Sequence, residues 1–126
     1  MAVTPHELVV EAKSQIKEVA CADAQALLGK RVVLDVREHD EYAAGHLPGA
    51  INIPRGILEF KIGMVPECAN KDGAFLLYCR TSGRAALSAV QLQKIGYVDV
   101  ISMAGGFEVW NKEGRPTEKP EPINFE

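Results

Sequence analysis

The sequence has no long hydrophobic stretch. No apolar run approaches the roughly 20 residues of a membrane-spanning helix, and the N-terminus lacks the basic start and apolar core of a secretion signal. The 126-residue chain has a formal net charge of -3, which gives no general attraction to nucleic acid or to an anionic membrane. We therefore expect a cytoplasmic protein that binds neither nucleic acid nor membrane, and any anion-binding site on it must be local.

Signals for disulfides, metals and cofactors are also scarce. The three cysteines, Cys21, Cys68 and Cys79, form no CxxC pair, and their odd number argues against a disulfide framework in so short a chain. The three histidines are scattered and show no metal-ligand spacing. No dinucleotide-binding or P-loop fingerprint is present. The sequence thus predicts reduced thiols and a protein that needs no metal or organic cofactor.

What the chain does have is the composition of one folded domain. It is 47% hydrophobic and 25% charged, and its length suits a single α/β domain with a buried core. Near-continuous apolar runs at 32–36 and 75–78 are typical of central strands covered on both faces. Further strands are predicted at 16–19, 51–53 and 98–101, and helices at 4–14, 22–28, 40–44, 57–64, 85–95 and 105–110. This alternation predicts a parallel sheet with helices on both faces.

The two ends of the chain are predicted to lie outside the core domain. Thr4 can cap a helix whose first turn takes Pro5, so residues 1–15 are interpreted as an N-terminal helical extension packed on the core. Residues 16–116 form the domain itself. Residues 117–126, with two prolines, are expected to be a loosely ordered tail. The sequence leaves open whether the N-terminal helix makes a homodimer.

The strongest chemical signal is the segment from Leu76 to Ala85, in which a buried strand ends at Cys79 and a loop enters a helix. Ligands of parallel sheets bind beyond the carboxyl ends of the strands. Unpaired amides at the helix start, a nest of loop amides and the charges of Arg80 and Arg84 would all stabilise a thiolate there. We therefore expect Cys79 to be largely ionised and nucleophilic at neutral pH.

A cysteine taken alone is more often a small buried hydrophobic residue than a nucleophile. For Cys79 the surrounding arginines favour the functional interpretation, since they would make little sense around an inert thiol. Cys21 and Cys68 have neither cationic neighbours in sequence nor a strand-to-helix setting, so both are interpreted as buried structural residues.

Four motifs in this chain closely resemble, in the right order, the signatures of the rhodanese family. They are LDVRE at 34–38, EYAAGHLPGAINIP at 41–54, YCRTSGR at 78–84 and GGFEVW at 105–110. The resemblance runs from about residue 16 to residue 116. It implies a rhodanese-like three-layer fold with a five-stranded parallel sheet, and a sulfurtransferase that holds a persulfide on Cys79. The implied partners are a small anionic sulfur donor such as thiosulfate and a thiol, cyanide or protein acceptor.

The resemblance also implies roles for single residues. The amides that cradle substrate and persulfide would belong to Arg80, Thr81, Ser82, Gly83 and Arg84. Arg80 matches a basic position of thiosulfate-using members, where mercaptopyruvate-using members usually have glycine. Thr81 stands where two-domain thiosulfate enzymes carry lysine, which leaves the physiological donor open. We expect the side chain of Arg84 to brace the loop through backbone carbonyls, whereas that of Arg80 reaches the pocket mouth.

Other residues of these motifs are predicted to support the site. Asp35 and Arg37 look like the family's strand-end pair, expected to brace loops through buried hydrogen bonds. His46 can be interpreted as a general base, but its Gly-His-Leu-Pro-Gly setting favours a turn held by side-chain hydrogen bonds. Phe107 and Trp110 are interpreted as core residues rather than a stacking platform.

Two rival functions remain at this point. The loop of a cysteine phosphatase of related fold typically has five residues between its cysteine and its arginine. Here four residues separate Cys79 from Arg84, and the next position is Ala85. The shorter loop suits one sulfur atom better than a tetrahedral oxyanion. The other rival is a catalytically idle rhodanese module used for protein binding or regulation, and the presence of Cys79 argues against it.

Overall fold

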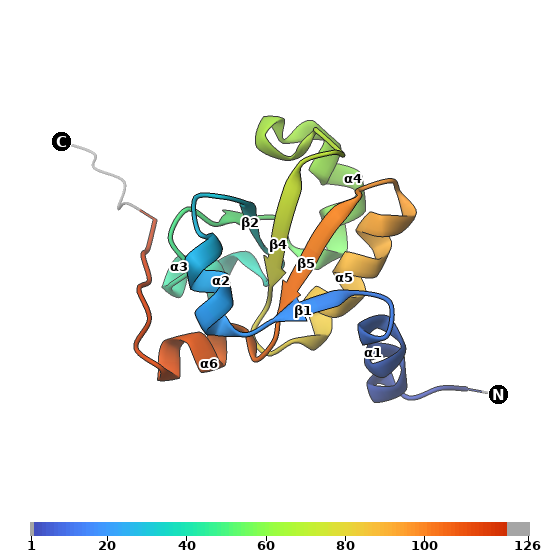
Figure 1. Ribbon diagram of the computed structural model, residues 1–126, viewed down its shortest axis with the longest axis horizontal. Helices are drawn as coiled ribbons and strands as arrows, with labels where there is room; N and C mark the ends of the chain where they lie inside the picture. The colour runs from blue at the N-terminus through green and yellow to red at the C-terminus, as the bar shows by residue number, and fades with distance from the viewer. Residues whose placement is uncertain (1, 121–126) are drawn as a thin grey trace.

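Five parallel strands form the middle layer of the structure, a computed structural model that describes residues 2–120 (Figure 1). Their order across the sheet is β1-β5-β4-β2-β3. The strands are β1 (Lys17–Val19), β2 (Val32–Asp35), β3 (Ile51–Asn52), β4 (Ala74–Tyr78) and β5 (Asp99–Met103), and every neighbouring pair is parallel. The predicted five-stranded parallel sheet is confirmed.

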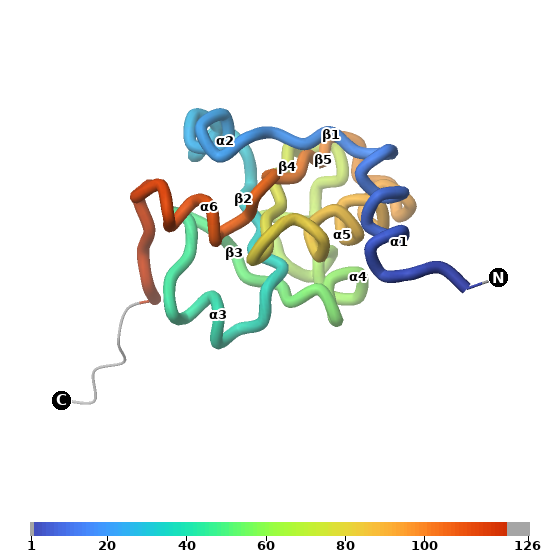
Figure 2. The backbone as a smooth tube through the Cα atoms, turned by 90° about the horizontal axis from the view of Figure 1, so that it is seen from below, coloured from blue at the N-terminus to red at the C-terminus, as the bar shows by residue number. Residues whose placement is uncertain are grey.

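Helices cover both faces of this sheet, as Figure 2 shows from the edge at which the strands end. The helices are α1 (Pro5–Lys13), α2 (Cys21–Leu27), α3 (His39–Ala44), α4 (Leu58–Lys61), α5 (Gly83–Lys94) and α6 (Gly106–Lys112). On one face α4 and α5 bury Leu58, Ala89 and Leu92 against the sheet. On the other face α2 and α6 bury Ala24 and Trp110. The central strands β2 and β4 are therefore almost wholly apolar, because neither of their faces meets water, and the buried Asp35 at the end of β2 is the exception.

The N-terminal helix forms for the reasons that its sequence indicates. The Oγ1 atom of Thr4 accepts a hydrogen bond from the Glu7 N–H at 3.1 Å, and the Glu7 carboxylate accepts one from the Thr4 N–H at 3.2 Å. This reciprocal pair satisfies two amides that would otherwise lack a partner. Pro5 occupies the first turn, where it loses no hydrogen bond.

One predicted helix is shorter than expected. The segment 57–64 contains only the four-residue helix α4, flanked by the 3-10 turns Arg55–Ile57 and Ile62–Met64. Gly63 weakens the end of this run, and Val65 is extended, with ψ at 115°, because Pro66 follows it. The chain then makes another 3-10 turn at Pro66–Cys68 before it enters β4.

The first residues of the predicted loose tail are in fact attached to the domain. The backbone of Glu118 exchanges two hydrogen bonds of 2.9 Å with that of His46, and its carboxylate accepts the Gly49 N–H at 2.7 Å. The expectation of a loosely ordered tail is therefore wrong for Glu118. Local sequence could not indicate this attachment, because His46 and Gly49 lie far from Glu118 in the chain. Residues 121–126 lie outside the described residues.

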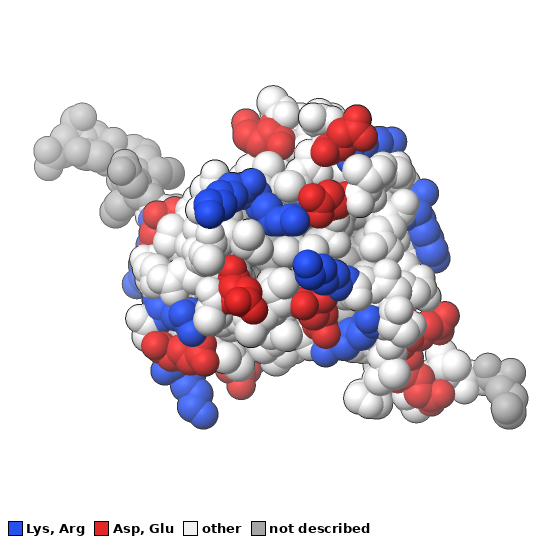
Figure 3. Space-filling view, viewed as in Figure 1, with Lys and Arg blue, Asp and Glu red and all other residues white. Residues whose placement is uncertain are grey.

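The surface offers few clues to partners. Within residues 2–120 no helix is long and apolar enough to cross a lipid bilayer. On the face shown in Figure 3, basic and acidic side chains are interspersed rather than gathered by sign. The cytoplasmic location and the lack of binding to nucleic acid and to membranes stay predictions, and the oligomeric state stays open.

Candidate active site

The loop after β4 lies at the carboxyl edge of the sheet, with Cys79 directly after the strand and Gly83 at the start of α5. The start of α6 holds this loop from one side. The Phe107 N–H donates to the Cys79 carbonyl at 2.8 Å, and the Glu108 N–H donates to the Arg80 carbonyl at 2.9 Å. Amides that a helix start leaves unpaired thus bind the carbonyls of the cysteine loop.

Gly106 allows this close approach. Its φ is +64°, and a Cβ atom at this position would overlap the carbonyl oxygen of Thr81 and lie 2.6 Å from that of Arg80. Only glycine combines the left-handed backbone with the missing side chain that such a contact needs. The double glycine of the fourth motif therefore serves loop geometry.

The Cys79 thiol is almost completely buried beneath the loop, with 1% of the residue exposed. The Ala85 N–H donates a hydrogen bond to its Sγ atom at 3.3 Å. Ala85 lies one position beyond the predicted set of loop amides, and within residues 2–120 it is the only group that donates to this sulfur. Because it is the third residue of α5, its amide has no helical acceptor and is free for the sulfur.

The two loop arginines lie differently. The Arg84 guanidinium forms two hydrogen bonds, of 2.9 and 3.1 Å, to the Glu41 carboxylate in α3. Arg84 therefore braces the loop through a side chain of α3. The expectation that it contacts backbone carbonyls is wrong, because its guanidinium binds Glu41 instead. The same guanidinium lowers the pKa of Glu41 to about 2, so the pair is fully charged at neutral pH. Glu41 opens the second motif, but nothing in its local sequence indicates this contact with Arg84.

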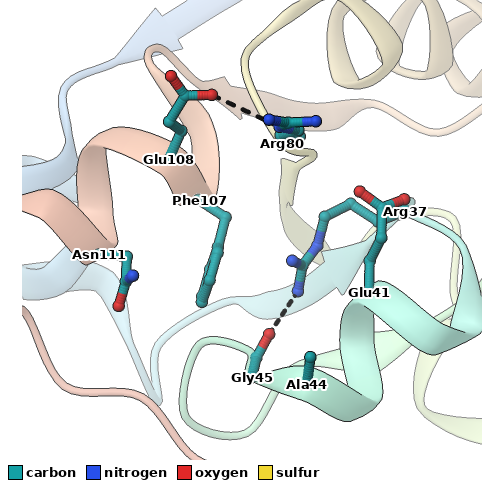
Figure 4. Close-up of a pocket in the computed structure, with 8 residues that line it drawn as sticks. All are labelled: Arg37, Glu41, Ala44, Gly45, Arg80, Phe107, Glu108 and Asn111. Atoms are coloured by element: carbon teal, nitrogen blue, oxygen red, sulfur yellow. Dashed lines mark hydrogen bonds and ion pairs between the residues drawn. The ribbon is translucent and has the colours of Figure 1, made fainter.

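The side chain of Arg80 points outward beside a pocket of about 340 Å³ between α3 and α6 (Figure 4). It is 71% exposed, and its Nε atom lies 3.5 Å from the Glu108 carboxylate. The pocket is lined by Arg37, Glu41, Ala44, Gly45, Arg80, Phe107, Glu108 and Asn111. Charges of both signs and one aromatic ring therefore surround this pocket. Arg80 brings the cysteine loop to its edge, while Cys79 is not among the residues that line it.

A buried polar network supports the floor of this pocket. The Arg37 guanidinium binds both Asp35 oxygens, at 3.0 Å and 2.6 Å, and also donates to the Gly45 carbonyl at 2.7 Å. The Tyr78 hydroxyl donates to Asp35 at 2.7 Å. Burial and the adjacent carboxylate of Asp35 raise the pKa of Tyr78, which keeps its proton in place for this bond. The guanidinium lies 4.3 Å from the centre of the Phe107 ring, a favourable cation–π distance.

His46 lies in a structural setting. Its ring stacks on Tyr42 with centroids 3.8 Å apart, and its Nδ1 atom lies 3.1 Å from the Tyr42 carbonyl oxygen. On its other side Nε2 lies 3.7 Å from the Glu118 carboxylate. Within the described part of the chain no hydrogen bond connects His46 with Cys79.

The other two cysteines are buried and free of disulfides. Burial raises the pKa of Cys68 to about 11, and burial likewise raises the pKa of Cys21. Both shifts favour the protonated thiol, which is a poorer nucleophile than the thiolate. Trp110 is fully buried and donates to the Pro116 carbonyl at 2.8 Å, while Phe107 both packs on the core and lines the pocket.

Comparison with known proteins agrees with this geometry. The profile of the rhodanese-like domain matches residues 20–113. A sulfurtransferase of Allochromatium vinosum is 28% identical over 114 residues, which are 90% of this chain and 99% of that protein. The thiosulfate sulfurtransferase GlpE of Pseudomonas fluorescens is 33% identical over 98 residues, covering 77% of this chain and 86% of its own.

A solved structure from Rhodopseudomonas palustris, protein RPA3614, is similar over nearly the whole chain. Its TM-score is 0.85 at 32% identity, with 94% of this chain and 96% of that chain covered. It is described as a protein of unknown function and a possible tyrosine phosphatase. Since the domain profile spans most of the sequence and sulfurtransferases are among its relatives, this chain belongs to the rhodanese-like sulfurtransferase family.

Proposed function

We propose that this protein is a sulfurtransferase that carries sulfane sulfur as a persulfide on Cys79 and takes it from a small anionic donor such as thiosulfate. The observation that carries the proposal is the hydrogen bond of 3.3 Å from the Ala85 N–H to the Cys79 sulfur at the start of α5. A backbone amide and the positive end of the helix dipole there favour a negatively charged sulfur.

The reaction has two steps. In the first, the Cys79 thiolate attacks the outer sulfur of thiosulfate, the S–S bond of the donor breaks, and sulfite leaves with the bonding electron pair. In the second, an acceptor thiolate or cyanide attacks the terminal sulfur of the persulfide, and the Cys79 thiolate is restored. This is covalent catalysis with a cysteine nucleophile. Neither step needs an added oxidant, a metal or a general base.

The surrounding residues would stabilise the charges of these steps. The Ala85 amide and the α5 dipole act on the thiolate and on the persulfide, and they are oriented before the reaction begins. The Arg84–Glu41 pair holds the loop that presents them. Arg80, at the pocket mouth, would attract the anionic donor.

A phosphatase is the second enzyme to consider, because the similar Rhodopseudomonas palustris protein is described as a possible one. The loop length argues against this activity here, since four residues separate Cys79 from Arg84. The Arg84 guanidinium also donates to both oxygens of Glu41, so that binding of a phosphate by the same donors would require this ion pair to break.

A side-by-side assay tests this choice. The purified protein is expected to form thiocyanate from thiosulfate and cyanide and to leave an aryl phosphate intact under the same conditions. Hydrolysis of the phosphate without formation of thiocyanate would assign the phosphatase instead. Absence of both activities would favour the idle module that binds other proteins.

A role for Arg80 in donor binding predicts a change in KM. We expect Arg80→Ala to raise the KM for thiosulfate several-fold at low salt, and to lose most of this effect at high salt, where exposed charges are screened. An uncharged persulfide donor should be much less affected. Steady-state kinetics with both donors measure this, with Arg55→Ala, an exposed site outside the pocket, as the control. Equal losses for the two donors would contradict the assigned role.

A further inference from the structure

The N-terminal helix contacts the cysteine loop directly. The Lys13 ammonium in α1 donates a hydrogen bond of 2.7 Å to the Oγ atom of Ser82. Val9, on the same helix, packs so closely that a Cβ atom on Gly83 would lie 3.3 Å from its side chain. Figure 2 shows α1 beside α5, and the family profile matches only residues 20–113, so this helix precedes the matched domain.

Ser82 precedes the first residue of α5, where a serine normally caps a helix. A capping hydroxyl accepts a hydrogen bond from the second or third helical amide, and the third helical residue here is Ala85. Ser82 makes no such bond, and its backbone, with φ -145° and ψ -16°, is not in the extended conformation of a capping residue. Its oxygen instead accepts from Lys13.

The amide that Ser82 leaves free is the one that binds the nucleophile, because the Ala85 N–H donates to the Cys79 sulfur. A hydroxyl oxygen that capped α5 would compete with the sulfur for this donor. Lys13 is well placed to prevent the competition. Its ammonium lies between Ser82 and the Glu18 carboxylate, which is 3.7 Å away, and is only partly exposed.

We propose that Lys13 is a positioning residue for Cys79: it holds the Ser82 hydroxyl away from the start of α5 and so reserves the Ala85 amide for the sulfur. The inference deepens the proposed function, because the same amide would stabilise the persulfide. Through Lys13, the N-terminal helix would thus contribute to the stabilisation of charge on the Cys79 sulfur. Lys13 does not line the pocket, so its loss should change turnover rather than donor binding.

A double-mutant cycle tests this inference. We expect Lys13→Met to slow alkylation of Cys79 by iodoacetamide about fivefold, since a competing cap is worth about 1 kcal/mol. The kcat with thiosulfate should fall by a similar factor while KM stays constant. On a Ser82→Ala background the same Lys13→Met change should have no further effect, because no hydroxyl remains to compete.

Two further variants separate this role from charge and packing. Lys13→Arg can still donate to Ser82 and is expected to keep the alkylation rate. Lys17→Met removes an exposed charge from the neighbouring strand β1 and should leave the rate unchanged. An equal loss from Lys13→Met with and without the Ser82 hydroxyl would overturn the proposal, as would no loss at all. Alkylation needs no sulfur donor. The alkylation rates of these variants therefore test the role of Lys13 even if the protein transfers no sulfur.

Discussion

Replacement of Cys79 by serine is expected to abolish sulfur transfer. A hydroxyl is a poor nucleophile toward sulfane sulfur, so thiocyanate formation should fall by at least about a thousandfold. The fold should survive, because the introduced hydroxyl oxygen is similar in size to the sulfur and can accept the same Ala85 N–H. Thiocyanate formation and thermal unfolding of the purified variant, measured together, separate lost chemistry from lost structure.

The two buried cysteines supply matched controls for this experiment. Cys21→Ser and Cys68→Ser remove thiols whose raised pKa values keep them protonated at neutral pH. Both variants should therefore keep most of the turnover. Transfer that persisted in Cys79→Ser, or that disappeared in Cys21→Ser without unfolding, would show that the nucleophile has been assigned to the wrong residue.

The substitution Gly106→Ala is expected to have the second-largest effect. The added methyl group would overlap the carbonyls of Thr81 and Arg80, so α6 and the cysteine loop must move apart. A shift of about 1 Å in a catalytic loop costs on the order of a hundredfold in rate. Overpacking and the positive φ together should lower the free energy of unfolding by about 2–4 kcal/mol.

Gly114→Ala separates the clash from backbone strain. Gly114 also has a positive φ, of +71°, but nothing lies within 4 Å of the position of its added Cβ atom. This variant should lose about 1 kcal/mol of stability and keep its turnover. Steady-state kinetics and urea unfolding of both variants make the comparison. Similar turnover in the two would mean that the contact between α6 and the loop does not position Cys79.

Local sequence signals were sufficient to predict the sheet and the position of Cys79 at its edge. The runs that became β2 and β4 are almost wholly apolar because both faces of the sheet are covered, and this composition is visible without a structure. The capping pair of Thr4 and Glu7 is only three residues apart. Cys79 follows one of these strands directly, so its place at the edge of a parallel sheet could be predicted.

The supports of the site could not be predicted in the same way, because they join distant parts of the chain. Glu41 and Arg84 are 43 residues apart, and Lys13 and Ser82 are 69 apart. Their contacts depend on where α1 and α3 lie in the folded protein. Glu118 is similar, since only the fold brings it beside His46. Local patterns thus placed Cys79 at the edge of the sheet, while the tertiary contacts determine how its loop is held.

The central claim is that Cys79 carries the transferred sulfur, and intact mass spectrometry tests it most directly. The protein is incubated separately with thiosulfate, 3-mercaptopyruvate and glutathione persulfide, freed of donor, and weighed before and after addition of cyanide. We predict a gain of one sulfur atom from at least one donor, located by peptide mapping on Cys79 and removed by cyanide. A protein that gained no sulfur from any donor, or gained it on Cys21 or Cys68, would contradict the account.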